Sequence, residues 1–218
     1  MEEIEHYLKK FDNLVIIELG VWRGDTTLKL LNNNKYNIKK YYGIDSYGMD
    51  EEVKPLHNIG LWPYYKETDP NQVGNDTYNY MKNILKNYNN VELIRKSTNN
   101  SHSMIENNST DLLYIDAGHT YEYVYNDLIN YYPKVKIGGL IIGDDYFMRN
   151  KKNAIYGKGY DCDMVYEALQ DFTKKYNIKF IESGTHGDYP ARYVIIKEKE
   201  LDEEIKISED ITNKIIHI

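Results

Sequence analysis

Three acidic residues at the ends of two apolar runs are the side chains best suited to chemistry. Asp116 ends the run Leu-Leu-Tyr-Ile-Asp, and Asp144 and Asp145 end the run Gly-Gly-Leu-Ile-Ile-Gly-Asp-Asp. If the runs form neighbouring strands, the carboxylates converge, and unpaired they would repel one another and take up protons. A hard divalent cation such as Mg²⁺ removes this conflict, because it prefers oxygen ligands. Neither motif contains a Lys or Arg, so the pattern favours a metal site. The alternative is that the three acids cap turns.

His119 follows Asp116 by three positions and would lie at the same edge. The ordinary pKa of an imidazole is near neutrality, which suits a general base at physiological pH. Asp116 itself is the other candidate base. A lone histidine is more often structural, so both interpretations of His119 stay open.

A second cluster predicts a binding site for a nucleotide-like cofactor. An apolar run ends on Glu18, and glycines at Gly20 and Gly24 precede a helical pattern that begins at Asp25. A strand, a glycine turn and a helix start bring such a ligand against bare backbone. A further apolar run, Tyr-Tyr-Gly-Ile-Asp, ends at Asp45, where a carboxylate can accept both hydroxyls of a ribose.

The glycine turn departs from the G-x-G-x-x-G pattern of dinucleotide sites. Val21 and Trp22 follow Gly20, and no third glycine stands in register. A pyrophosphate requires that close backbone approach, whereas a ligand without phosphate tolerates its absence. Because many turns contain two glycines four positions apart, a plain strand-to-helix connection is the alternative.

The elements that must position these residues alternate along the chain. Several apolar runs are nearly continuous, as expected for strands covered on both faces, and helical patterns separate them. This alternation predicts a mostly parallel sheet with helices on both sides and ligands at the carboxyl ends of the strands. The predicted strands are 14–19, 40–45, 91–95, 112–116, 140–144, 179–182 and 192–197, and the predicted helices are 2–11, 25–31, 77–88, 101–107, 121–132 and 163–176.

Length and composition narrow the function classes. The 218 residues fit one α/β domain, 1–218, with a charged C-terminal tail at 200–218. A net charge of −7 argues against nucleic acid or an anionic membrane as the partner. The single cysteine, Cys162, excludes an internal disulfide and fits a reducing compartment. The N-terminus has no apolar signal core and no run has the length of a membrane span, so we expect a cytoplasmic protein.

Residues 46–75 form a long connection that we expect to act as a lid or substrate wall. The segment 146–160, which follows the second acidic run, contains both basic and aromatic residues. The alternative is that the aromatic residues fill the core and the arginine is a surface charge. The candidate substrate contacts are Trp62, Tyr64, Tyr65, Tyr146 and Arg149.

Two motifs together resemble a known family. Glu18-Leu-Gly-Val-Trp-Arg-Gly-Asp-Thr26 resembles the cofactor motif of class I S-adenosylmethionine-dependent methyltransferases, nearest to the small metal-dependent O-methyltransferases of the catechol and caffeoyl-CoA type. Asp116-Ala-Gly-His-Thr-Tyr-Glu, with the run from Lys136 to Tyr146, is more similar to a bacterial and viral branch that includes macrolide-sugar O-methyltransferases. The resemblance covers residues 12–148. It implies a Rossmann-like, seven-stranded sheet whose last strand is antiparallel.

The resemblance also implies roles for individual residues. Gly20 and Gly24 would line the methionine moiety of S-adenosylmethionine, and Thr26 would reach its carboxylate. Asp45 would hold the ribose, and Ser97 and Thr98 would border the adenine. Glu18 would orient the cofactor, and Mg²⁺ would be held by Asp116, Asp144 and Asp145. The remaining expected cofactor contacts are Trp22, Ser46 and Asp116.

The chain departs from the catechol-type pattern at two places. It has His119 where those enzymes have a lysine base, and Asp144-Asp145 where they commonly have Asp-Asn. Both departures favour the sugar-modifying branch. We therefore expect Mg²⁺-dependent methylation of a hydroxyl on a sugar, a sugar nucleotide or a glycan, by a homodimer by analogy. The alternatives are an NAD-dependent oxidoreductase on a similar sheet and a non-catalytic cofactor-binding protein of the same fold.

Overall fold

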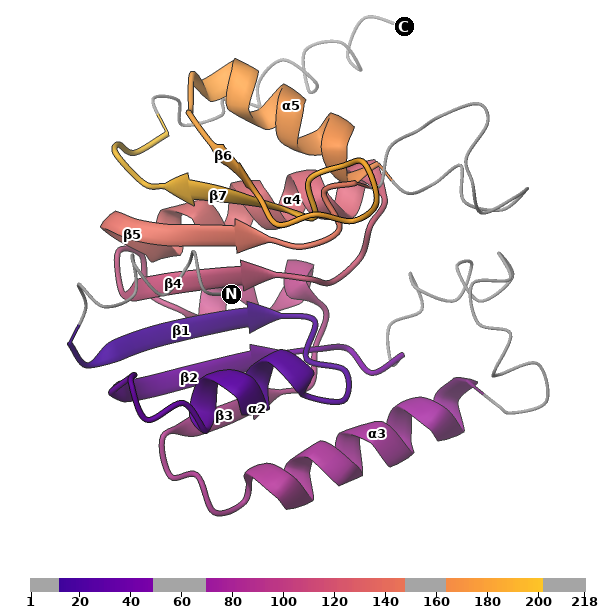
Figure 1. The fold of residues 1–218 in the computed structure, drawn as a ribbon. Coiled ribbons are helices and arrows are strands. Elements are labelled where there is room, and N and C mark those ends of the chain that lie inside the picture. Colours follow the sequence, from indigo (N-terminus) through magenta and orange to yellow (C-terminus); the bar gives the residue numbers. More distant parts are fainter. Residues whose placement is uncertain (1–11, 49–69, 148–163, 202–218) are drawn as a thin grey trace, which may run out of the picture.

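A seven-stranded sheet forms the centre of the protein (Figure 1). The computed structural model describes residues 12–48, 70–147 and 164–201. The strand order is β3-β2-β1-β4-β5-β7-β6, in which the first five strands are parallel and β7 runs antiparallel to both of its neighbours. The strands are β1 (Leu14–Leu19), β2 (Ile38–Ile44), β3 (Val91–Ile94), β4 (Thr110–Ile115), β5 (Val135–Gly143), β6 (Ile181–Ser183) and β7 (Arg192–Ile196). The predicted mostly parallel sheet with an antiparallel last strand is confirmed.

Helices cover both faces of the sheet, as predicted (Figure 1). One apolar cluster joins α4 and α5 to alternate residues of the central strands, such as Ile17 and Leu113. The intervening residues, such as Ile16 and Leu112, pack with Leu30 of α2 on the other face. The helices are α2 (Asp25–Leu31), α3 (Pro70–Leu85), α4 (Tyr121–Tyr131) and α5 (Val165–Tyr176), with 3₁₀ turns at Thr98–Asn100, His102–Met104 and Tyr132–Lys134.

Local sequence explains where the site-bearing helices begin. α2 starts after Gly24, whose φ of 78° is accessible to glycine at little cost. Thr120 precedes α4, and its side chain accepts a hydrogen bond from the backbone of Tyr123, which is an N-cap contact. Glu122 adds a negative charge to the first turn of α4, where the helix dipole favours it.

Two elements start five or more residues earlier than predicted. α3 begins at Pro70 instead of residue 77, because Pro70 suits a first helical turn and the polar stretch after it only looks like a loop. Gly74 lies inside this helix, where an added Cβ would be 1.9 Å from the carbonyl oxygen of Tyr47. β5 begins at Val135 instead of residue 140, since the glycine pair 138–139 is accommodated in the strand.

Several expectations have a different outcome or fall outside the described residues. The predicted helix 101–107 is replaced by the short 3₁₀ turns. Residues 70–75 of the expected lid belong to α3. The rest of that lid from residue 49, the helix 2–11 and the tail from residue 202 lie outside the described residues. In the described part of the chain, no helix has the length and apolar character needed to cross a membrane.

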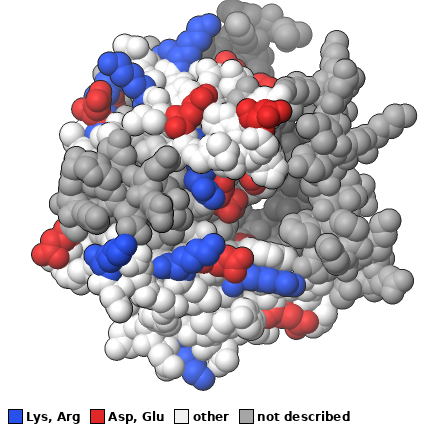
Figure 2. Space-filling model, in the orientation of Figure 1, with Lys and Arg blue, Asp and Glu red and all other residues white. Residues whose placement is uncertain are grey.

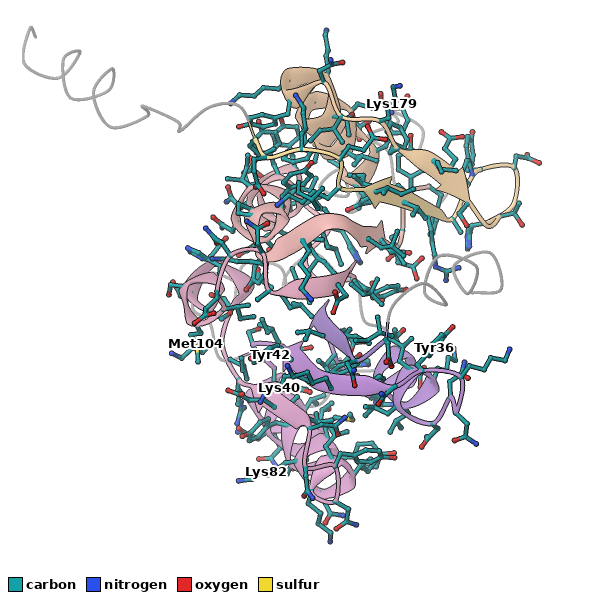
Figure 3. The ribbon with its side chains drawn as sticks, turned by 90° about the vertical axis from the view of Figure 1, so that its left-hand side faces the viewer. Tyr36, Lys40, Tyr42, Lys82, Met104 and Lys179 are labelled. Carbon is teal, nitrogen blue, oxygen red and sulfur yellow. The ribbon has the colours of Figure 1, made fainter. Side chains whose placement is uncertain are left out.

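The outer strands carry charged and aromatic side chains. Lys40 and Tyr42 lie close together on β2 (Figure 3), with the ammonium nitrogen of Lys40 4.9 Å from the centre of the Tyr42 ring. Lys40 also pairs with Glu92 of β3 at 2.7 Å. Both side chains of this pair are partly exposed, so this part of β2 and β3 faces solvent.

Candidate active site

The acidic residues expected at the site share one edge of the sheet. Each follows a strand, and its backbone N–H is bound by the neighbouring strand. Asp45 donates to Ile94 at 3.1 Å, Asp116 to Leu19 at 2.8 Å and Asp144 to Ile115 at 2.9 Å. β1 lies between β2 and β4, which is where the strand order reverses. Ligands of such sheets bind outside the carboxyl ends of the strands at this point.

The two glycines of the first turn have packing roles. Gly20 has a φ of 87°, and a Cβ added to it would lie 1.8 Å from the carbonyl oxygen of Asp116. A Cβ on Gly24 would lie 2.3 Å from the terminal methyl of Met81 in α3. Close packing therefore explains both glycines, and their contact with a methionine moiety stays a prediction.

Asp45 connects the turns that follow β1 and β2. One carboxylate oxygen accepts the backbone N–H of Trp22 at 2.8 Å, and the other accepts that of Tyr47 at 2.7 Å. Burial raises the pKa of Asp45, and the backbone donors oppose that effect. Trp22 itself has a φ of 47°, so the carboxylate holds a turn that is unfavourable for a bulky residue. The ribose contact of Asp45 and the cofactor contact of half-buried Ser46 stay predictions.

Glu18 is buried beneath the glycine turn from Gly20 to Gly24, called the cofactor turn below. The sequence did not reveal the hydrogen-bond partners of Glu18. Thr27 of α2 and Tyr41 of β2 both donate hydrogen bonds to the same carboxylate oxygen, the latter at 2.7 Å. Burial raises the pKa of Glu18 to about 7, although both hydrogen bonds act to lower it. Glu18 therefore links α2 to the sheet through Thr27. The expected contact of Thr26 with the carboxylate of the cofactor stays a prediction.

The segment after β3 presents polar atoms without hydrogen-bond partners among the described residues. Ser97 and Thr98 are buried, and the Thr98 carbonyl accepts the hydroxyl of Tyr131 at 2.8 Å. The hydroxyl oxygen of Ser97 and the amide oxygen of Asn99 are buried without a partner. Buried polar atoms are normally hydrogen-bonded, so these two fit a polar ligand such as an adenine edge. Asn99 was missed in the sequence, where a run of polar residues hides it.

Asp116, His119 and Asp145 form the only group with metal-ligand geometry in the described residues. One ligand atom from each lies within 4.8 Å of the others. Nε2 of His119 is 3.1 Å from Asp145 and 3.8 Å from Asp116. Two carboxylates and an imidazole fit a divalent cation that also takes water ligands. The expected pair Asp116 and Asp145 is thus brought together, with His119 in the third place.

The charge state of His119 differs from the expectation. Burial alone would lower the pKa of His119, but its contacts with Asp116 and Asp145 raise it to about 10. Burial also raises the pKa of Asp116. Without a metal, His119 is therefore a cation at neutral pH that neutralises the two acids. The premise that its pKa lies near neutrality is wrong for this state.

Asp144 does not join that group, and the reason is a partner from β7. One of its oxygens accepts Nη2 of Arg192 at 3.0 Å, Nε of Arg192 at 3.2 Å and the hydroxyl of Tyr114 at 2.6 Å. Neither motif contains a basic residue, as noted from the sequence, but Asp144 is paired with Arg192, which lies 48 positions further along the chain. The sequence motif could not show this pairing.

The expected substrate wall is only partly described. Tyr146 is fully buried and packs against Tyr166, Phe180 and Tyr193, so the core interpretation holds for it. Trp62, Tyr64, Tyr65 and Arg149 lie outside the described residues. Phe147 stacks on His186 of the turn between β6 and β7, with ring centres 3.9 Å apart. That turn lies at the same end of the sheet as the acids.

Comparisons with known proteins agree with this geometry. The family model Methyltransf_24, described as a methyltransferase domain, matches residues 17–146. An uncharacterized protein of Acanthamoeba polyphaga mimivirus is 30% identical over 146 residues, which are 67% of this chain and 57% of that protein. The chain thus spans little more than half the length of this relative.

Solved methyltransferases share the fold at low sequence identity. The O-methyltransferase NovP is 19% identical with a TM-score of 0.58, over 91% of this chain and 79% of that chain. The S-adenosylhomocysteine-bound Podospora anserina methyltransferase PaMTH1 is 12% identical with a TM-score of 0.55, over 84% and 71%. The family match covers more than half of the chain and includes the cofactor turn and the acidic cluster. The chain therefore belongs to the Methyltransf_24 family of methyltransferase domains.

Proposed function

We propose that the protein transfers the methyl group of S-adenosylmethionine to a hydroxyl oxygen of a sugar, a sugar nucleotide or a glycan, with a divalent cation held by Asp116, His119 and Asp145. The observation that supports this proposal most strongly is the position of that cluster. Asp116 belongs to it and also contacts the cofactor turn, through the close approach of its carbonyl oxygen to Gly20. A methyl donor and an acceptor hydroxyl would therefore meet at Asp116.

The charge of this edge favours a sulfonium donor over a dinucleotide. Glu18, Asp45 and Asp116 all lie near the cofactor turn, and the charges of Asp45 and Asp116 both act to raise the pKa of Glu18. A cationic sulfonium is attracted to such a site, whereas a pyrophosphate is repelled. This argues against the NAD-dependent alternative.

The residues of the cluster have separable tasks. A bound divalent cation would lower the pKa of an acceptor hydroxyl and fix its position. Asp116 and His119 are both candidate bases, because both side chains lie in the cluster where the acceptor hydroxyl would be held. His119 holds a proton at neutral pH, and it must lose that proton before its nitrogen can bind a metal.

The acceptor class is supported by the motifs and by the surface. His119 and Asp145 stand where the catechol-type enzymes have lysine and asparagine, which resembles the sugar-modifying branch. Among the described residues on the face shown in Figure 2, basic and acidic side chains are interspersed without a continuous basic area. This arrangement fits a small polar acceptor better than nucleic acid.

Two measurements test the proposal. Titration calorimetry should show binding of S-adenosylhomocysteine but not of NAD; the reverse result would support the oxidoreductase. Transfer of labelled methyl groups from S-adenosylmethionine to a panel of nucleotide sugars should then stop in EDTA and return with Mn²⁺. Asp116→Asn should lower the rate of methyl transfer by about 10²-fold or more. Asp76→Asn, at an exposed position on α3, should leave the rate unchanged. Cofactor binding without transfer to any acceptor would favour the non-catalytic alternative.

A further inference from the structure

We propose that Arg192 is a positioning residue: through Asp144 it fixes the turn that aims Asp145 at His119. This inference rests on the proposed function, because it concerns the same metal cluster. It differs from the sequence-based expectation, in which Asp144 is itself a metal ligand.

Asp144 is held by two neighbouring strands, β4 and β7, and by the next residue of its own turn. Its backbone N–H donates to Ile115 at the end of β4. One carboxylate oxygen accepts two donors from Arg192 of β7 and the hydroxyl of Tyr114 of β4. The other oxygen accepts the backbone N–H of Asp145 at 3.0 Å. Both oxygens therefore have protein partners, and the charge of Asp144 is balanced by a guanidinium.

Asp145 has a backbone conformation that needs such support. Its φ is 56°, in the left-handed region, which costs roughly 1–2 kcal/mol for a residue with a side chain. An unfavourable backbone conformation is retained where contacts from the surrounding structure fix it, and such residues are often found at functional sites. In this conformation, a carboxylate oxygen of Asp145 lies 3.1 Å from Nε2 of His119.

The start of β7 holds both neighbours of Asp145. Arg192 binds the side chain of Asp144, and the carbonyl of Ala191 accepts the backbone N–H of Tyr146 at 2.9 Å. Figure 1 shows β7 lying directly beside β5, whose end leads into this turn. Two consecutive residues, Ala191 just before β7 and Arg192 at its start, thus hold the positions before and after Asp145. Loss of the Arg192 contact removes one of these two attachments.

The two interpretations of Asp144 give opposite predictions. If Asp144 is a metal ligand that Arg192 holds back, removing the guanidinium frees the ligand and tightens metal binding. If Asp144 positions Asp145, removing the guanidinium loosens the turn and weakens metal binding. Groups that orient metal ligands typically contribute 10- to 100-fold to affinity.

The experiment is a Mn²⁺ titration followed by electron paramagnetic resonance, on the full chain with S-adenosylhomocysteine present. Arg192→Gln should weaken Mn²⁺ binding by roughly 10- to 100-fold. Arg192→Lys should recover part of the loss, because lysine keeps the charge but not the paired donors. Lys136→Met is the matched control: it breaks the 2.7 Å ion pair with buried Asp111, far from the cluster along β5, and should leave affinity unchanged.

The outcomes separate the inference from the proposed function. Unchanged or tighter Mn²⁺ binding by Arg192→Gln overturns the inference and leaves the metal site standing. Wild-type protein that binds S-adenosylhomocysteine but no Mn²⁺ overturns the metal part of the proposed function, and the inference with it. If Arg192→Gln does not fold, Arg192→Lys takes its place, because it keeps the charge beside Asp144 but not the paired donors. It should still bind Mn²⁺ more weakly than wild type, and equal or tighter binding overturns the inference.

Discussion

The backbone of Gly20 packs directly against the carbonyl oxygen of Asp116, which would lie 1.8 Å from any Cβ at position 20. This contact joins the turn after β1 to the turn after β4. The two halves of the site are therefore fixed relative to each other by main-chain atoms, which cannot move aside as a flexible side chain can.

Gly20→Ala should lower the free energy of unfolding by about 3 kcal/mol, from the positive φ and the backbone overlap together. Urea denaturation measures this loss. Gly138→Ala is the control, because its φ is 84° but no atom lies within 4 Å of an added Cβ. It should cost only about 1 kcal/mol. Equal losses would mean that the turn near Asp116 can relax.

Asp127 of α4 should make the protein less stable at alkaline pH. It is fully buried, its carboxylate oxygens lack hydrogen-bond partners among the described residues, and burial raises its pKa to about 7. The folded protein favours the neutral carboxyl group, so its folded-state pKa is raised. The contribution of Asp127 to folding stability is therefore fully present below about pH 4 and is lost as the pH rises through 7. Asp127→Asn should match wild type near pH 4 and be more stable at pH 8, by roughly 2–4 kcal/mol.

Denaturation of both proteins at the two pH values checks this prediction for Asp127. Asp76→Asn, at an exposed carboxyl group on α3, should follow the wild-type profile. A variant at position 127 that is no more stable than wild type at pH 8 would show that the buried carboxyl group is solvated or paired in solution.

His119 should give the metal-free protein a second pH dependence. The folded-state pKa of His119 is about 10, above the ordinary value of 6.5. Protonated His119 therefore contributes fully to folding stability below pH 6.5, and this contribution is lost as the pH rises through 10. In EDTA, the thermal midpoint of wild type should fall by several degrees across this interval. His119→Gln should flatten that part of the curve, and an unchanged slope would contradict the ion pairs with Asp116 and Asp145.

Asp45→Asn should weaken binding of S-adenosylhomocysteine by roughly 10- to 100-fold, which corresponds to the loss of hydrogen bonds to a charged acceptor. Calorimetry measures the change. Glu92→Gln is the control, because Glu92 pairs with Lys40 on the outer strands. Wild-type affinity in Asp45→Asn would show that this carboxylate only holds the turns through Trp22 and Tyr47.

The sheet and much of the site could be predicted because they depend on local patterns. The bounds of β1 and α2 match the prediction, since an apolar run and a glycine turn define them. Asp116 and Asp145 meet because adjacent parallel strands end at the same edge. The pairing of Asp144 with Arg192 could not be predicted, since an antiparallel strand from a distant segment supplies the partner.

Other errors arise from tertiary contacts as well. The raised pKa of His119 depends on its distance to Asp145, which no motif states. Tyr146 follows two acids in the sequence, yet it lies in the core beneath β7. α3 runs through Gly74, where the carbonyl oxygen of Tyr47 approaches so closely that no Cβ would fit, and no sequence motif shows this contact.

The placement of Arg192 bears on how this domain can be divided. The family match ends at residue 146, so a fragment trimmed to it would retain the glycine turn and all three aspartates of the acidic motifs. It would lack the guanidinium that balances Asp144 and would uncover the hydrogen-bonding edge of β5. Any minimal expression fragment should therefore continue through Ile196, even though no recognisable motif lies in its last fifty residues.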